Sequence, residues 1–177
     1  ASTRTKIFEG LPTAGLPPYL RNFSEFQRFM RTLQRAKTIQ SIREVWWDIR
    51  PHPGFGTVEI RVCDIPINFK EIIAIVSVIQ ALVVTLINLD PYPDTHIQIL
   101  QSNKWQAARY GLDGVFVDQK TYKKLSIRKA IENLYLLIEP AIISLGSKKY
   151  FGTLEKILNS NAGSTRQRKI YNTSNNF

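Results

Sequence analysis

The sequence is poor in residues that cross-link, bind metals or carry protons. Its 177 residues include one cysteine, Cys63, so no disulfide can form within the chain, which favours a reducing compartment. Only two histidines, His52 and His96, are present. The first ten residues, ASTRTKIFEG, contain neither the apolar run of a secretory signal nor an initiator methionine. We therefore expect a cytoplasmic protein whose first residue results from processing or from excision out of something longer.

Acidic residues are also scarce, with 14 Asp and Glu against 24 Lys and Arg, which gives a net charge of +10. This excess is typical of proteins that bind nucleic acid, an anionic membrane or a phosphate-bearing substrate. Solvated helix faces, or the absence of an acidic partner segment, would explain it equally well. The basic residues recur in three groups: Arg28, Arg31, Arg35 and Lys37; Lys120, Lys123 and Lys124; Arg166, Arg168 and Lys169. No RNP-like, zinc-knuckle or helix-turn-helix pattern occurs, so the sequence argues against a nucleic-acid partner.

Composition and pattern predict one globular domain, residues 1–177, of the α+β class. Hydrophobic residues make up 44% of the chain and charged residues 21%, which is ordinary for a folded protein. Capping residues and apolar spacing predict helices over about 24–37 (with Ser24 and Gln27 as a capping box), 69–88, 102–110 (capped by Ser102, ended by Gly111), 126–146 (kinked or divided at Pro140) and 153–159. Strands are predicted at 45–50, 57–63 and 112–118, with turns or loops at 11–18, 51–56 and 90–94 and a polar tail from 161. We therefore expect a small antiparallel sheet packed with helices.

The helix predicted over 69–88 is apolar almost all round and begins with Asn68 and Glu71 in a capping arrangement. At 1.5 Å per residue it would be about 30 Å long, enough to span a bilayer. Polar residues interrupt it, however, and no aromatic belt flanks it. We favour a central core helix that is hydrophobic on all sides, and no membrane partner.

Alternation along the two strands at 45–50 and 57–63 places charged residues on one surface. The predicted apolar faces consist of Val45, Trp47 and Ile49 and of Val58, Ile60 and Val62, and the polar faces of Trp46, Asp48 and Arg50 and of Thr57, Glu59, Arg61 and Cys63. Because both apolar faces must meet the same core, both polar faces are expected to look the same way. Two carboxylates and two guanidiniums would then share one surface.

A symmetric closure of the six-residue loop 51–56 would set Arg50 opposite Thr57, Asp48 opposite Glu59 and Trp46 opposite Arg61. Like charges directly across a ladder are destabilising, so Asp48 and Glu59 would need a neighbouring arginine or a bound cation. Carboxylates suit Mg²⁺ and arginines suit phosphate. A slip of one residue or a bulge would break this pairing. On spacing alone, a charged and solvated sheet face explains the pattern too.

The two remaining reactive side chains near this surface are His52 and Cys63. His52 falls in the predicted loop, where it could touch a substrate or have no ligand at all. Cys63 shares the polar face but has no neighbouring base to activate its thiol, so we interpret it as a small packing residue.

Four segments resemble, in the same order along the chain, a known enzyme family. The longest is REVWWDIRPHPGFGTVEIRVCD (43–64), and the others are LPTAGLPPY (11–19), NKWQAARYGLDG (103–114) and AGSTRQR (162–168). They are similar to the carboxylate–amine ligases of the glutamate–cysteine ligase type, a branch of the glutamine synthetase-like superfamily. The resemblance covers nearly the whole chain and implies the C-terminal half of such a catalytic domain.

The resemblance implies an ATP-dependent ligase. Such enzymes phosphorylate a substrate carboxylate, usually the γ-carboxylate of glutamate, and the amine of a second substrate attacks the acyl phosphate. Mg²⁺ ions on the concave face of an antiparallel sheet hold the phosphates. The residues implied are Glu59 and Asp48 for the metal, Arg61 and Arg50 for catalysis, and Arg109 and Arg166 for ATP. Phosphoryl transfer is catalysed mainly by positioning and by placed cations, which suits a chain with two histidines.

The chain departs from the family in its length. Complete members are much longer than 177 residues, and their N-terminal part supplies further acidic ligands in an E-x-E pattern that is absent here. One pair of carboxylates cannot hold two or more metal ions. We therefore expect little or no ligase activity from the chain alone, and either self-association into a homo-oligomer or pairing with a missing N-terminal half. A non-catalytic binding or assembly module derived from the ligase fold is the alternative.

Overall fold

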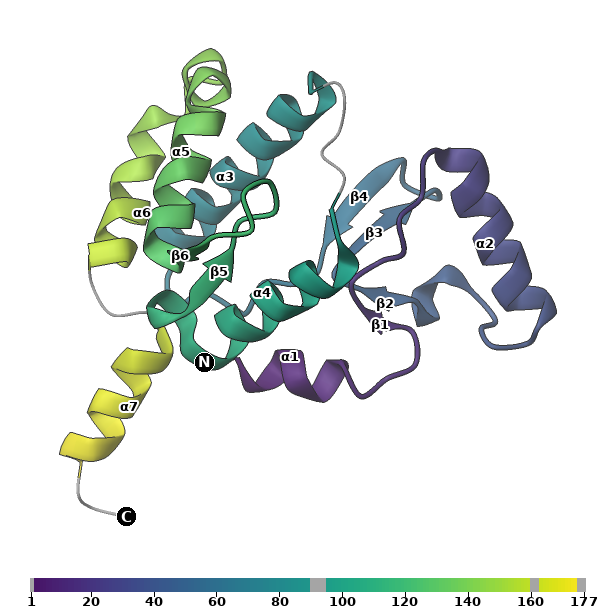
Figure 1. Ribbon diagram of the computed structural model, residues 1–177, viewed down its shortest axis with the longest axis horizontal. Helices are drawn as coiled ribbons and strands as arrows, with labels where there is room; N and C mark the ends of the chain where they lie inside the picture. Colours follow the sequence, from purple (N-terminus) through teal and green to yellow (C-terminus); the bar gives the residue numbers. More distant parts are fainter. Residues whose placement is uncertain (1, 90–94, 160–162, 175–177) are drawn as a thin grey trace. The chain divides into compact units, whose positions relative to one another are not determined.

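The computed structural model describes residues 2–89, 95–159 and 163–174, apart from the side chains of residues 157 and 159. The chain divides into two compact units: Thr3–Asp64, here the N-terminal unit, and Ile65–Phe177 with Ala1–Ser2, here the C-terminal unit (Figure 1). Helices predominate, and the described strands form three two-stranded sheets. The predicted α+β class is therefore confirmed. That the two units make one domain stays a prediction.

The N-terminal unit contains α1 (Thr3–Phe8), β1 (Ala14–Gly15), α2 (Phe23–Arg35), the 3₁₀ turn η1 (Ile42–Glu44), β2 (Trp46–Trp47), β3 (Ile49–His52) and β4 (Thr57–Ile60). β1 pairs in parallel with β2, and β3 pairs with β4 in an antiparallel hairpin. The prediction that residues 11–18 hold no regular structure was wrong at β1. Gly15 ends that strand with φ 98°, a value that suits glycine.

Helix α2 begins one residue earlier than predicted and has a different cap. Asn22, rather than Ser24, is the N-cap, and its side chain accepts a hydrogen bond from the backbone N–H of Glu25. The Glu25 carboxylate in turn accepts from the backbone N–H of Arg21. Asparagine is among the best N-cap residues, and Asn22 with Glu25 reproduces the capping spacing two positions upstream of the predicted one.

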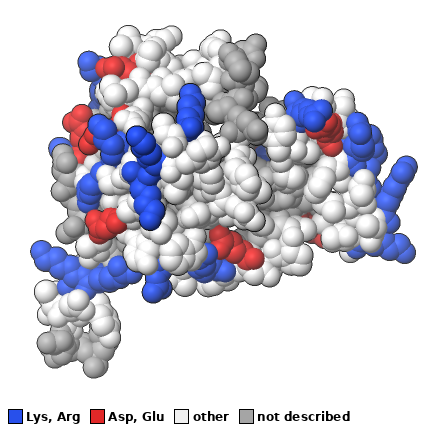
Figure 2. All heavy atoms as spheres, in the orientation of Figure 1, with Lys and Arg blue, Asp and Glu red and all other residues white. Residues whose placement is uncertain are grey.

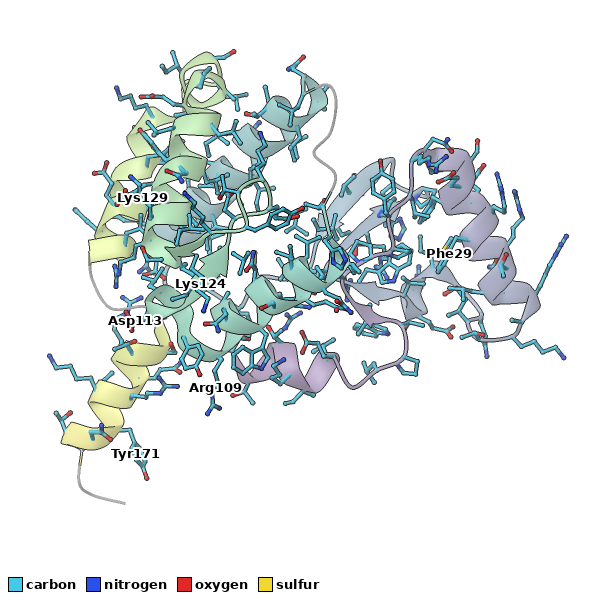
Figure 3. All side chains as sticks on the ribbon, in the orientation of Figure 1. Phe29, Arg109, Asp113, Lys124, Lys129 and Tyr171 are labelled. Carbon is cyan, nitrogen blue, oxygen red and sulfur yellow. The ribbon has the colours of Figure 1, made fainter. Side chains whose placement is uncertain are left out.

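The core of the N-terminal unit lies between α2 and the segment that leads into β2. Its buried residues are Phe26, Met30, Ile39, Val45 and Trp47. Phe29 points from α2 toward the strands, and its ring lies 5.5 Å from that of Trp47 (Figure 3). Val45 and Trp47 therefore face the core as predicted.

The predicted apolar face does not continue beyond Asp48. Ile49 is 45% exposed and Val58 59% exposed, whereas Arg50 is buried. The physical reason is a change of partner: β2 pairs with β1, whereas β3 pairs with β4. At the junction the carbonyl of Asp48 accepts from the N–H groups of both Arg61 and Val62, so that two residues oppose one, as in a β-bulge.

The C-terminal unit contains α3 (Phe69–Ile87), α4 (Ile97–Tyr110), the 3₁₀ turn η2 (Gly111–Asp113), β5 (Val115–Val117), β6 (Lys124–Ser126), α5 (Ile127–Ser144), α6 (Lys148–Asn159) and α7 (Gly163–Thr173). β5 and β6 form an antiparallel hairpin, of which only the first strand was predicted. α5 continues through Pro140 as one helix rather than being divided there. The segment expected to be a polar tail forms α7. The loop predicted at 90–94 lies outside the described residues.

The start of helix α4 was predicted wrongly, and its end correctly. It starts at Ile97, five residues before the predicted start, because the His96 side chain accepts from the N–H of Gln98 as the cap. Ser102 is thus inside the helix. The helix ends at Tyr110, and Gly111 follows it with φ 62°, which confirms the predicted glycine stop.

Helix α3 packs against α5 and α6, with the three helices side by side (Figure 1). The core there includes Ala81, Ile138 and Ile142. By length and hydropathy α3 is also the one described helix that could cross a membrane, a test that core helices pass as well. Only 22% of that apolar window is buried, and Val76 is 55% exposed. The predicted core helix therefore packs on α5 and α6 but buries only part of its apolar surface.

Candidate functional site

The β3–β4 hairpin positions the charged residues that the sequence singled out. Its register pairs Arg50 with Glu59, Pro51 with Val58 and His52 with Thr57. The predicted register, with Arg50 opposite Thr57 and Asp48 opposite Glu59, was therefore wrong by two residues. The turn occupies only residues 53–56, so that Pro51 and His52 extend the first strand. Since the error is an even number of residues, the residues predicted to share a face across the hairpin still do so.

Glu59 holds two arginines at once. Its Oε2 atom accepts from Nη2 of Arg50 at 2.7 Å and from Nη1 of Arg61 at 3.0 Å. The hydrogen bond from Arg61, followed by the bond and the charge of Arg50, holds the pKa of Glu59 below its ordinary value despite partial desolvation. The Arg61 guanidinium also lies 5.0 Å from the ring centroid of Trp46, a cation–π distance. The expected meeting of Glu59, Arg50 and Arg61 on one face is therefore present.

Arg50 is the buried member of this cluster. Its side chain is 5% exposed, against 24% for Arg61 and 32% for Glu59. Its Nη1 donates to the backbone carbonyls of Ile42, Arg43 and Val45, which belong to η1 and the residue after it. Since Nη2 is taken by Glu59, these two nitrogens bind the protein itself. Arg50 is thus built to hold Glu59 and the preceding turn in place, whereas Arg61 can meet a ligand.

The carboxylate of Glu59 offers one oxygen to a metal ion. Oε1 has no hydrogen bond among the described residues, although Oε2 is shared by two cations. No group of three or more His, Cys, Asp or Glu side chains gathers anywhere in the described part of the chain. Asp48 does not lie opposite Glu59. Glu59 therefore fits Mg²⁺ as a single ligand, and the remaining ligands would be phosphate oxygens, water or other carboxylates.

A second ion pair joins distant parts of the C-terminal unit. Arg166, on α7, donates from Nη2 to Oε1 of Glu71 at 2.8 Å. Glu71 lies in the first turn of α3, where it also accepts from the backbone N–H of Ile67 and from the side chain of Asn68. The Arg166 bond is the main reason that the pKa of Glu71 lies below its ordinary value. Glu71 is 11% exposed and Arg166 39% exposed, so the arginine keeps an accessible side.

Arg109 and Cys63 are not members of these two ion pairs. Arg109 is exposed near the end of α4 (Figure 3). Cys63 is exposed rather than packed, which corrects its interpretation as a packing residue. Partial desolvation of its thiol and the charge of Asp64 raise its pKa, although Arg4 opposes this, so that the thiol is not an activated nucleophile.

Basic side chains occur in separate groups within each unit. In the N-terminal unit they follow α2, and in the C-terminal unit they include Lys124 beside the β5–β6 turn and the exposed basic residues of α7 (Figure 2). Small clusters of basic side chains such as these are typical of solvated helix and hairpin surfaces.

Sequence reasoning missed the partnership of Glu71 with Arg166 and the burial of Arg50. The pattern Asn68–Glu71 indicated the cap of α3, which is confirmed. Nothing in the pattern could assign a partner 95 positions away.

Comparison with known proteins shows which proteins this chain is similar to. The family model described as glutamate–cysteine ligase family 2 matches residues 1–176. A protein of Gloeobacter violaceus is 38% identical over 177 residues, which cover 98% of this chain and 48% of the relative. One from Frankia alni is 40% identical over 178 residues, covering 96% and 46%, and one from Solibacter usitatus is 33% identical over 174 residues, covering 96% and 45%. All three carry the provisional name glutamate–cysteine ligase 2, the Frankia protein as 2-1.

The chain spans about half the length of the curated relatives it matches. The resemblance inferred from residues 43–64 and the three shorter segments agrees with the family match, which extends over nearly every residue. The chain belongs to glutamate–cysteine ligase family 2.

Proposed function

We propose that this chain is the C-terminal part of an ATP-dependent carboxylate–amine ligase that forms an amide bond through an acyl phosphate. The observation that carries the proposal is the carboxylate of Glu59, held by Arg50 and Arg61 with its second oxygen open. A fixed carboxylate beside an accessible guanidinium is the arrangement that phosphoryl transfer needs, because charge develops on the transferring group. Family membership supports the same reaction class.

Each residue of the cluster has a distinct part in this proposal. Arg61 binds an oxygen of the transferring phosphate or of the substrate carboxylate. Arg50, buried beneath, fixes the direction of Glu59. Oε1 of Glu59 would hold Mg²⁺, with Asp48 as a second candidate ligand. Bound Mg²⁺ would neutralise phosphate charge.

Two further arginines are candidates for ATP. Arg166 is the better supported, because Glu71 holds one of its nitrogens and leaves the side chain partly exposed. Arg109 is exposed at the end of α4 and sits in a segment that resembles the family motif. The substrates would be a glutamate-like carboxylate and an amine.

We further propose that the chain alone has little or no ligase activity, because the described residues gather no group of three or more side chains that could hold a metal ion. The remaining acidic ligands would come from the part of the relatives that this chain does not match, or from a partner in a homo-oligomer. A cytoplasmic site of action fits a ligase that consumes ATP.

An ATP-consumption assay with glutamate and candidate amines tests the proposal, on the chain alone and joined to its upstream segment. In the joined protein Glu59→Gln should lower kcat at least about 100-fold, because even residues that only support a metal ligand are worth 10–100-fold. The matched control is Glu132→Gln, which removes an exposed carboxylate paired with Lys129 on α5. Equal activity of Glu59→Gln and the wild type would refute the metal role. Absence of ATP-dependent ligation in the joined protein would favour a non-catalytic binding or assembly module.

A further inference from the structure

His52 lies on the same side of the hairpin as the charged cluster. It belongs to β3, two residues beyond Arg50, and it pairs across the ladder with Thr57, which is itself two residues before Glu59. Since side chains two apart on a strand share a face, His52, Arg50 and Glu59 look the same way. The prediction that His52 falls in the loop was therefore wrong. It is a strand residue on the candidate site's own surface.

The imidazole ring is held in one orientation. It stacks on Phe55 with ring centroids 4.5 Å apart and an interplanar angle of 27°. The turn also lies near the ring, since a Cβ atom added to Gly54 would be 3.4 Å from Cε1 and 3.6 Å from Nδ1 of His52. Aromatic stacking and this close approach limit rotation of the ring. Both neighbours therefore favour one orientation of the ring.

The two nitrogens have opposite surroundings. Nδ1 is buried and has no hydrogen-bond partner. Nε2 makes no hydrogen bond to the described residues. Since it is also not one of the buried atoms without a partner, it is accessible to solvent. A buried N–H without an acceptor is costlier than an unmet lone pair. In the neutral ring the proton therefore belongs on Nε2, which presents an N–H donor at the surface.

The charge of this face indicates which kind of ligand the Nε2–H of His52 would bind. Two arginines surround one glutamate, which leaves an excess of positive charge beside His52. A hydrogen bond from a neutral N–H to an ionised oxygen is stronger than one to a neutral acceptor. An oxygen of a carboxylate or a phosphate is therefore the favoured partner of the Nε2–H donor.

We propose that His52 is a substrate-binding residue of this face, which donates Nε2–H to an anionic oxygen of the substrate, with its ring aimed by Phe55 and Gly54. The inference rests on the proposed function for the identity of the substrate, because both a glutamate-like carboxylate and a phosphate are expected there. It requires no covalent step and no titration of the ring.

Two substitutions separate binding from packing. His52→Phe keeps an aromatic ring to stack on Phe55 but removes the donor. His52→Gln loses the ring but places an N–H near the position of Nε2. If His52 binds an anion, His52→Phe weakens binding of inorganic phosphate or of glutamate about tenfold, the typical worth of a hydrogen bond to a charged group, and His52→Gln restores most of it. The opposite order, with Phe tolerated and Gln damaging, would show a purely structural ring.

Nuclear magnetic resonance of the chain labelled with ¹⁵N-histidine provides a readout that does not depend on ligase activity. The chain has only two histidines, and His96→Asn removes the other signal while asparagine keeps the cap of α4. The expected spectrum shows the proton on Nε2 of His52, and a saturable shift with phosphate, with glutamate or with both, which distinguishes the two sources of the oxygen. A proton on Nδ1, or no response of His52 to either anion, would overturn the proposal even if a substituted chain failed to fold.

The outcomes for His52 and for the ligase are separate. Anion binding with the expected order of variants, in a protein that shows no ATP-dependent ligation, would refute the proposed function but keep His52 as a binding residue. Ligation that depends on Glu59 but is indifferent to His52→Phe would do the reverse.

Discussion

The two units of the molecule use an arginine–glutamate pair in opposite ways. In the N-terminal unit the arginine is buried and the carboxylate faces solvent, since Arg50 is 5% exposed and Glu59 32%. In the C-terminal unit the carboxylate is buried and the arginine faces solvent, since Glu71 is 11% exposed and Arg166 39%. The buried member also bonds to backbone groups in both pairs: Nη1 of Arg50 donates to three carbonyls, and Glu71 accepts from the N–H of Ile67.

This difference shows how one type of ion pair can present either sign of charge to a ligand. A buried charge is tolerated only when its hydrogen bonds are met, so each pair anchors one partner in backbone groups and exposes the other in a fixed direction. The first pair offers a carboxylate oxygen, which suits a metal ion. The second offers a guanidinium, which suits a phosphate. Substituting one buried or one exposed member of a pair at a time tests whether the two pairs differ in this way.

The largest effect is expected from Arg50→Met. The substitution keeps much of the side-chain volume but leaves three backbone carbonyls without their donor and Glu59 without one of its two cations. We expect a loss of about 3–5 kcal/mol in the free energy of unfolding, as for other buried ion pairs with one partner removed. Urea denaturation followed by tryptophan fluorescence measures it.

Arg43→Met is the matched control, because Arg43 precedes the same hairpin but its side chain is exposed. It should change the free energy of unfolding by less than about 0.5 kcal/mol. Equal effects of the two substitutions would show that the bonds of Nη1 do not stabilise the unit.

A smaller effect is expected from Arg166→Met, which removes the exposed member of the other pair. Glu71 keeps its bonds from Ile67 and Asn68, and the arginine is partly solvated, so we expect a loss of about 1–2 kcal/mol. Hydrogen exchange of α7 should also become faster, because no side chain of α7 is buried and the Arg166 pair anchors it. An unchanged exchange rate in α7 would contradict this anchoring role.

The smallest effect is expected for Glu71→Gln, whose loss of stability relative to the wild type should depend on pH. The pKa of Glu71 lies below its ordinary value in the folded chain, so its stabilising contribution is complete above that ordinary value and disappears as the pH falls through the lowered one. Glutamine still suits the capping position but carries no charge. Glu71→Gln should therefore be about 1 kcal/mol less stable than the wild type at neutral pH, with a gap that closes in acid.

Thermal unfolding at a series of pH values measures this gap. Glu132→Gln serves as the control, because that carboxylate is 59% exposed in its pair with Lys129 and should give a small gap at every pH. A gap for Glu71→Gln that widens in acid would have the wrong sign for a lowered pKa.

The shared face of Glu59, Arg50 and Arg61 could be predicted because strand side chains alternate with a period of two, which local sequence reveals. The register could not, because it depends on how many residues the turn takes. Four residues rather than six close the hairpin, which brings Arg50 opposite Glu59 and makes the arginine itself the neutralising partner. The family was recognisable from residues 43–64 regardless of that register.

Features that depend on distant contacts were beyond local reasoning. The burial of Arg50 needs the carbonyls of η1, whose direction follows from tertiary packing rather than from composition. α7 was missed because its segment is rich in polar residues, and Arg166 gains its partner only when α3 lies beside it. α3 itself was located correctly, but only four of its 19 residues are buried, although it is apolar almost all round.

The bonds that Arg50 makes to η1 have a consequence for how the N-terminal unit opens. A side chain from the hairpin saturates carbonyls of the preceding turn, so neither segment can leave its place without breaking the bonds of the other. The two segments should therefore behave as a single cooperative foldon. Breathing motions that release Glu59 would then have to unravel the turn at residues 42–45 as well, which makes the orientation of the carboxylate as durable as the local fold.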